Sequence, residues 1–268
     1  MKSINKIIAT ASLSLWALAA NANTTTHPFA NGSWVDLTHP FNEHTVYWPT
    51  AENFKKTTVY EGNTEGGYYY SAYNFSGAEH GGTHLDSPVH FYEGRHSADQ
   101  VPIEQLIGPA VVINISQQAQ KNRDYQLTVD DIKNWQVKNG PIAPNSILLI
   151  DTGSAKYYTD KVKYMGTDKR GQEGVKALSF PGISPQAASY LAKKIRVKAV
   201  GIDTPSLDYG KSTDFAAHVI LFEHNIPGFE NVADLSSLPP KGTTIVALPM
   251  KISGGSGGPL RIVAFVPK

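Results

Sequence analysis

The sequence contains no cysteine among its 268 residues. This absence excludes disulfide bonds, thiolate metal ligands, a cysteine nucleophile and a lipid-modified cysteine behind a leader segment. The fold must therefore be stabilised by its core, for which a hydrophobic content of 41% is sufficient. Any metal site in this chain has to be built from nitrogen and oxygen ligands.

The sequence also has a net charge of only +1 and few long hydrophobic runs. Its 24 basic and 23 acidic residues give no basic face for nucleic acid. The one extended apolar run, Ile7 to Ala20, is shorter than a typical transmembrane helix. It follows a basic start and precedes a small-x-small ending at Ala22. This pattern predicts a signal peptide, residues 1–22, cleaved after Ala22, rather than a retained anchor. We expect residues 23–268 to form a single domain that is periplasmic or secreted and not bound to a membrane.

Strand-like runs occur throughout the mature chain. In its first third, residues 57–60 and 68–75 have the composition of antiparallel strands. Short apolar runs typical of buried strands occur at 110–115, 146–151 and 197–202.

Helix signals separate the later strands. Thr128 and Ser184 are predicted N-caps, and Pro185 occupies the first position of the second helix. The segment 156–177 has no clear period, and we expect an irregular surface loop there. The mixture of antiparallel strands and alternating strands and helices favours an α/β or α+β fold with several layers.

Three histidines and one aspartate occupy even-numbered positions in the stretch from His80 to His90. In an extended chain, alternate side chains lie on one face, so His80, His84, Asp86 and His90 could point into one space. Two glycines and a proline in the stretch argue against a helix. Imidazoles with a carboxylate are typical ligands of zinc or manganese. The alternative, a set of core histidines, would require a polar partner for each ring and is disfavoured.

A second candidate pair lies further along the chain. A helix predicted from Asp214 places His218 on an apolar stripe with Phe222, so His218 faces inward. Taken alone, a core histidine bonded to a backbone carbonyl is the favoured interpretation. However, Glu230 follows in another apolar context, and a buried carboxylate rarely lacks a partner or a cation. His218 and Glu230 thus offer one more nitrogen and one more oxygen ligand.

The segment 254–258 matches the pattern Gly-x-Ser-x-Gly of serine hydrolases. That motif works as a turn between a strand and a helix, with the acid and the histidine later in the chain. Here Pro259 and a β-rich run follow, and no Asp, Glu or His remains downstream. We therefore do not expect Ser256 to be a nucleophile, and we expect a flexible or closely packed loop.

The motif His-x-Gly-Thr-His-x-Asp-x-Pro-x-His at residues 80–90 resembles the signature of the metal-dependent cyclase family. The segments 36–40 and 47–49, the Gly201-x-Asp203 strand and the residues around His218 and Glu230 are similar to other parts of that family's pattern. The resemblance thus covers nearly the whole mature chain. It implies a swivelling β/β/α domain with mixed sheets and packed helices, assembled into a homodimer or homotetramer.

The resemblance also implies the activity of a metal-dependent amidohydrolase. The implied ligands of one or two divalent ions, Zn²⁺ or Mn²⁺, are His80, His84, Asp86, His218 and Glu230. Asp86 would be shared between the two ions. His90 would be the general acid/base, and Trp48 would lie against the substrate.

A divalent ion would activate water and polarise an amide carbonyl. We therefore expect hydrolysis of the C–N bond of a small aromatic or cyclic amide, such as isatin or an N-formyl aromatic amine. The chain end at 253–261 looks more like the isatin hydrolase side of the family, so kynurenine formamidase proper is the alternative. A non-catalytic exported metal-binding protein is a second alternative, which the Trp48 region and the spare His90 disfavour.

Overall fold

The largest element of the structure is a mixed sheet with the strand order β1-β12-β11-β5-β7-β9-β10-β4. The computed structural model describes residues 29–268, and the chain from Asn31 to Lys268 forms one unit. β4 pairs with β12 as well as with β10, so all strands of this sheet except β1 form a closed ring of pairings. The strands are β1 (Gly32–Asp36), β4 (His84–Asp86), β5 (Ile107–Asn114), β7 (Ile147–Asp151), β9 (Ala199–Ile202), β10 (Gly228–Glu230), β11 (Lys241–Pro249) and β12 (Gly257–Pro267).

The strands β5, β7, β9 and β10 are parallel and lie at the centre of the protein. Every residue of β7 is buried, with Leu148 and Ile150 in one core cluster and Ile147 and Leu149 in another. Parallel strands that are covered on both faces have continuous apolar sequences instead of alternating ones. This is why the run at 146–151 could be predicted as a buried strand.

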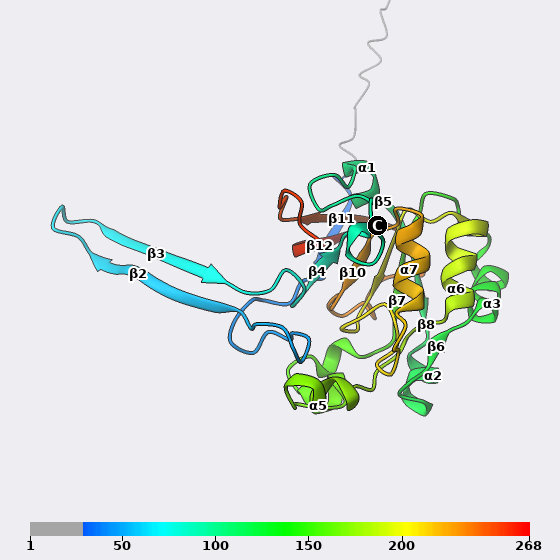
Figure 1. The fold of residues 1–268 in the computed structure, drawn as a ribbon. Coiled ribbons are helices and arrows are strands. Elements are labelled where there is room, and N and C mark those ends of the chain that lie inside the picture. The colour runs from blue at the N-terminus through cyan, green and yellow to red at the C-terminus, as the bar shows by residue number, and fades with distance from the viewer. Residues whose placement is uncertain (1–28) are drawn as a thin grey trace, which may run out of the picture. The chain divides into compact units, whose positions relative to one another are not determined.

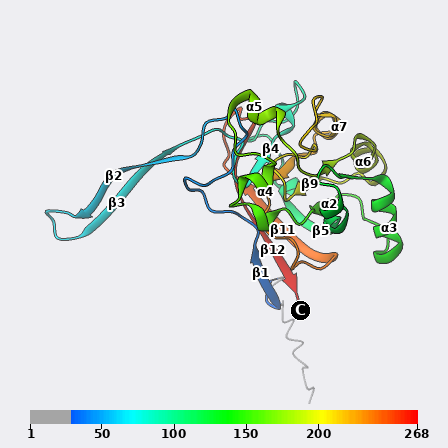
Figure 2. The same ribbon diagram turned by 90° about the horizontal axis from the view of Figure 1, so that it is seen from below.

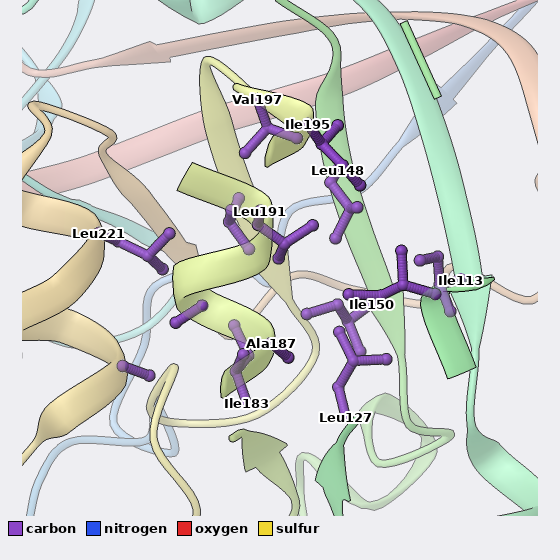
Figure 3. Close-up of a cluster of buried hydrophobic side chains, with 14 of the residues drawn as sticks. Ile113, Leu127, Leu148, Ile150, Ile183, Ala187, Leu191, Ile195, Val197 and Leu221 are labelled. Atoms are coloured by element: carbon purple, nitrogen blue, oxygen red, sulfur yellow. The ribbon is translucent and has the colours of Figure 1, made fainter. Parts of the chain in front are cut away.

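Helices cover one face of these parallel strands (Figure 1). Ala187 and Leu191 pack between Ile150 of β7 and Leu221 of α7 (Figure 3). The α-helices are α1 (Ile103–Leu106), α2 (Ser116–Lys121), α3 (Val129–Asn139), α4 (Lys161–Met165), α5 (Gly171–Lys176), α6 (Pro185–Tyr190) and α7 (Ala216–Glu223). Short helical turns of other types are η1 (Pro88–His90), η2 (Ala155–Tyr157) and η3 (Leu191–Ile195). The predicted mixture of sheets and packed helices is confirmed.

The predicted N-caps are confirmed by their hydrogen bonds. Thr128 accepts from the backbone N–H of Asp131 at 3.1 Å, and the Asp131 carboxylate accepts from the Thr128 N–H at 2.8 Å. This reciprocal capping box begins α3. Ser184 accepts from the Ala187 N–H at 3.2 Å, with Pro185 at the first position of α6.

The expectation of an irregular surface loop at 156–177 is wrong. The segment contains α4 and α5, and Tyr158, Tyr164 and Met165 are buried in a cluster with Val46. These helices have only five and six residues, which is too short for an apolar period to be visible in the sequence. The segment thus contributes to the packing behind the candidate site.

Two small sheets complete the fold. β2 (Lys55–Asn63) and β3 (Tyr69–Ser76) form an antiparallel hairpin, which confirms the strand prediction for this region. The hairpin extends away from the eight-stranded sheet (Figure 1, Figure 2). β6 (Gln126–Leu127) and β8 (Gly182–Ile183) pair in parallel.

The predicted signal peptide, residues 1–22, lies outside the described part of the chain. Within residues 29–268, no helix has the length and apolar character needed to cross a bilayer.

Candidate functional site

The histidine-rich stretch folds as a loop, a short strand and a helical turn. His84–Asp86 forms β4, His80 precedes it in a loop, and His90 ends the 3₁₀ turn η1. The expectation that residues 80–90 form one continuous extended segment is therefore wrong at both ends. His80, His84 and Asp86 nevertheless converge, because Asp86 Oδ1 lies 2.7 Å from His80 Nδ1 and 3.0 Å from His84 Nε2.

A second group of potential ligands shares Asp86 with the first. Asp86 Oδ2 lies 3.2 Å from His218 Nε2, which is 3.0 Å from Glu230 Oε1. His218 belongs to α7, and Glu230 belongs to β10, where it pairs directly opposite His84 of β4. In each group of three, the potential ligand atoms lie within 4.8 Å of one another. The structure thus brings together the five residues for which a ligand role was predicted.

Two glycines explain the local shape of the first group. A Cβ on Gly81 would lie 2.1 Å from the ring of Tyr47, so only glycine fits there. Gly82 has a left-handed φ of +57°, and its carbonyl oxygen lies 2.9 Å from His84 Nδ1. Because a carbonyl oxygen can only accept, His84 Nδ1 carries the hydrogen. In the neutral ring, His84 Nε2 therefore presents its lone pair to the carboxylates.

Asp208 is a site residue that the sequence analysis missed. Its Oδ2 lies 2.6 Å from His218 Nδ1, and the backbone N–H groups of Ala217 and His218 donate to its carboxylate at 2.9 and 3.1 Å. Asp208 thus caps the start of α7 and turns His218 so that Nε2 faces Asp86 and Glu230. The loop between Asp208 and His218 has no periodicity, and the only available signal was an acidic residue shortly after a predicted strand.

Burial and the neighbouring charges shift the pKa values of this cluster. Burial and the charge of Asp86 raise the pKa of Glu230. Burial acts in the same direction on Asp86, but the neighbouring histidines outweigh it and hold its pKa well below the usual value. Burial opposes protonation of His218, but its bonds to Asp208, Asp86 and Glu230 outweigh this and raise its pKa well above the usual value. A bound cation would displace such protons and take over their role.

The donor set fits a divalent cation. His84 Nε2 is buried and has no hydrogen-bond partner among the described residues. It lies 3.0 Å from Asp86 Oδ1 and 3.5 Å from Glu230 Oε2. A lone pair and two carboxylate oxygens directed at one point repel each other unless a proton or a cation lies between them. Imidazole and carboxylate donors suit Zn²⁺ and Mn²⁺.

A cavity of about 290 Å³ opens at this cluster. Tyr47, Trp48, Phe91 and Phe215 are its aromatic wall, and no lysine or arginine of the described part of the chain lines it. The ring of His90 stacks on that of His80 with centroids 3.8 Å apart, and His90 also lines the cavity. Desolvation by these surroundings lowers the pKa of His90 to about 4. The two residues for which catalysis and substrate contact were predicted, His90 and Trp48, thus both border the cavity beside the five potential ligands.

Comparison with known proteins gives a consistent result. The family model described as "Putative cyclase" matches residues 35–209. Isatin hydrolase of Roseibium aggregatum is 30% identical, with 87% of this chain and 92% of that protein aligned. Kynurenine formamidase of Bacillus mycoides is 26% identical, with 86% and 96% aligned.

Solved structures agree with these sequence matches. Isatin hydrolase A from Ralstonia solanacearum superimposes with a TM-score of 0.78 at 30% identity, covering 87% of this chain and 92% of that chain. Isatin hydrolase A from Labrenzia aggregata, bound to benzyl benzoate, gives a TM-score of 0.80 at 28% identity, covering 88% and 94%. The predicted family and fold are therefore confirmed: the chain belongs to the cyclase family and is a hydrolase of that family.

Proposed function

We propose that this hydrolase cleaves the amide C–N bond of a small aromatic or cyclic amide, using water activated by one or two divalent ions. The observation that carries the proposal is the buried His84 Nε2, which has no hydrogen-bond partner among the described residues and lies 3.0 Å from Asp86 Oδ1 and 3.5 Å from Glu230 Oε2. The names of the relatives, isatin hydrolase and kynurenine formamidase, support the reaction class.

The residues would divide into two ligand groups. His80, His84 and Asp86 would hold one ion, and Asp86, His218 and Glu230 would hold the second. A Zn²⁺ or Mn²⁺ ion bound there supplies Lewis acidity, which lowers the pKa of a water molecule and polarises the scissile carbonyl. Asp86 holds both groups together, because each of its two oxygens faces a different group.

His90 is the proposed general acid/base. Within the described residues, its ring has aromatic neighbours but no hydrogen-bond partner, so its nitrogens are available to a substrate. Its lowered pKa keeps the ring neutral at pH 7, and a neutral imidazole can accept a proton from the attacking water. The same nitrogen can then return that proton to the leaving amide nitrogen.

The cavity favours a flat, neutral substrate. The rings of Trp48, Phe91 and Phe215 offer apolar surface to an aromatic amide. Among the described residues no lysine or arginine lines the cavity, so a substrate with an amino-acid carboxylate would have no basic side chain to pair with besides the proposed ions. This supports a cyclic amide such as isatin over the substrate of kynurenine formamidase proper. The open cavity beside the ligands also argues against a non-catalytic metal-binding protein, in which all ligand positions are closed.

Hydrolysis of isatin and of N-formylaniline should be measured with the purified protein, before and after dialysis against a chelator. We expect turnover of isatin that disappears on dialysis and returns with Zn²⁺ or Mn²⁺. Full activity in the dialysed, metal-free protein would refute the proposal. Preference for the formyl substrate would reassign the specificity to the formamidase side.

We further propose that the chain assembles into a homodimer or homotetramer through the β2–β3 hairpin. An isolated two-stranded hairpin is marginally stable in water, and this one exposes 61% of both Tyr69 and Phe75. Lys56 lies near its base and Glu61 near its tip, so a two-fold antiparallel arrangement would bring opposite charges together. Light scattering should show an oligomer that the double substitution Tyr69→Ser, Phe75→Ser dissociates; a monomeric wild type would contradict this.

We also propose that the protein is exported after cleavage behind Ala22, on the basis of the N-terminal sequence pattern. The N-terminal residue of the mature protein, identified by mass spectrometry, tests this. An intact Met1 on the isolated protein would contradict it.

A further inference from the structure

The glycine-rich segment 254–258 leads into a strand. β12 begins at Gly257 and pairs antiparallel with β4, so that Gly257 lies opposite Asp86. This confirms that the segment is not a nucleophile elbow, which requires a turn from a strand into a helix. The pairing also brings Ser256 next to the ligand cluster, where its Oγ lies 2.8 Å from His80 Nε2.

Glu79 determines the direction of this hydrogen bond. Its Oε2 accepts from the backbone N–H groups of Ser256 and Gly257 at 2.9 and 3.3 Å and lies 2.8 Å from Ser256 Oγ. An oxygen that already accepts two amide hydrogens is an acceptor for the hydroxyl as well, so the one hydroxyl proton of Ser256 points to Glu79. Only lone pairs of Oγ remain for His80. His80 Nε2 is therefore the donor.

This assignment decides which nitrogen of His80 faces the ligand cluster. With the hydrogen on Nε2, the neutral ring carries its lone pair on Nδ1. Nδ1 lies 2.7 Å from Asp86 Oδ1, the oxygen that also faces His84. A metal-ligating histidine commonly donates its other N–H to an oxygen acceptor, which fixes both the tautomer and the ring orientation.

The glycines allow the segment to approach His80 closely. A Cβ on Gly257 would lie 2.6 Å from His80 Cε1, and a Cβ on Gly255 would lie 3.0 Å from Glu79 Oε1. The carbonyl of Ser256 also accepts from the backbone N–H of Ser87 at 2.8 Å. The segment is therefore a closely packed support behind the His80 ring.

Ser256, His80 and Asp86 also have the contacts of a Ser–His–Asp triad, at 2.8 and 2.7 Å. Two observations argue against a nucleophilic Ser256. Its proton is directed to Glu79, so His80 Nε2 cannot accept it, and Ser256 is not among the residues that line the cavity.

We propose that Ser256 and Glu79 are positioning residues, which hold His80 as the Nε2–H tautomer with Nδ1 directed at the metal site. The inference rests on the proposed function, because it assumes that a divalent ion binds there. Its consequence is that loss of the Ser256 hydroxyl weakens metal binding without removing a ligand.

The metal-free protein should be titrated with Zn²⁺ in competition with a chromophoric chelator. We expect Ser256→Ala to weaken binding of one ion by about 10- to 100-fold. Ser256→Thr, which keeps the hydroxyl, should restore most of this affinity. Ser253→Ala is the matched control, since Ser253 is exposed in the same loop, and it should bind as the wild type does.

Glu79→Gln provides an independent test, and it decides the matter if Ser256→Ala fails to fold. This substitution should also weaken zinc binding. Glu79 Oε2 accepts three hydrogens, and the glutamine side chain can place an NH₂ group, which is a donor, at the same position. Wild-type zinc affinity in a folded variant would overturn the inference. Wild-type affinity of Ser256→Ala combined with lost turnover would instead identify Ser256 as the nucleophile. A wild-type protein that binds no zinc would refute the proposed function itself.

Discussion

The substitution Asp208→Asn tests the geometry of the second ligand group most directly. Asp208 is not among the residues that line the cavity and is not one of the potential metal ligands. Its Oδ2 lies 2.6 Å from His218 Nδ1. We expect the variant to bind the ion of the His218 and Glu230 group more weakly while the His80 and His84 group keeps its ion. At a free zinc concentration that fills both groups of the wild type, the variant should then hold closer to one ion per chain.

The magnitude follows from the contacts that Asp208 makes. Its Oδ2 accepts both the ring N–H and the backbone N–H of His218, and its Oδ1 accepts the N–H of Ala217. An asparagine has one acceptor oxygen, so it can keep the two His218 bonds only by turning its NH₂ group towards Ala217. Loss of the supporting negative charge should cost about 10- to 100-fold in metal affinity, or roughly 1.4–2.7 kcal/mol. The lost helix cap should cost about 1 kcal/mol of stability, lowering Tm by about 2–4 °C.

Competition titration with Zn²⁺ and thermal unfolding of the metal-free protein measure these two effects separately. Asp214→Asn is the matched control, because Asp214 is an exposed carboxylate shortly before the same helix. Unchanged affinity at both sites in Asp208→Asn would refute the orienting role of Asp208. Equal weakening of both sites would show that the two groups are not separate.

Three further outcomes are expected. His90→Ala should lower kcat by about 10²- to 10⁴-fold with metal still bound, and loss of metal would instead make His90 a ligand. Trp48→Ala should raise KM for isatin by about tenfold or more through loss of apolar contact area, and an unchanged KM would remove Trp48 from the substrate site. Burial raises the pKa of Asp203 from 3.8 to about 6, so the folded state binds this proton more tightly and stability is lost as pH rises from 4 to 7. The free energy of unfolding of the wild type, minus that of Asp203→Asn, should therefore fall by about 3 kcal/mol over that range. A difference that does not depend on pH would contradict this.

Local patterns in the sequence were sufficient to predict several central strands, the starts of α3 and α6 and the type of chemistry, but not the short helices α4 and α5. Continuous apolar runs predicted the buried strands β5, β7 and β9, because burial on both faces leaves no polar positions. The caps at Thr128 and Ser184 depend on residues three positions away, so they can be recognised locally. The histidines and the aspartate of residues 80–90 were recognisable because their residue types and close spacing are rare outside metal sites.

Only the tertiary structure decided how these residues are supported. Asp86 meets His218, 132 positions away, because α7 packs against η1, the turn that follows β4. Ser256 meets His80, 176 positions away, because β12 pairs with β4. Such contacts depend on strand order and register, which leave no periodic trace in the sequence. The residue types thus determined that a cation could bind, whereas the pairing of distant strands decided which nitrogen of each histidine faces it.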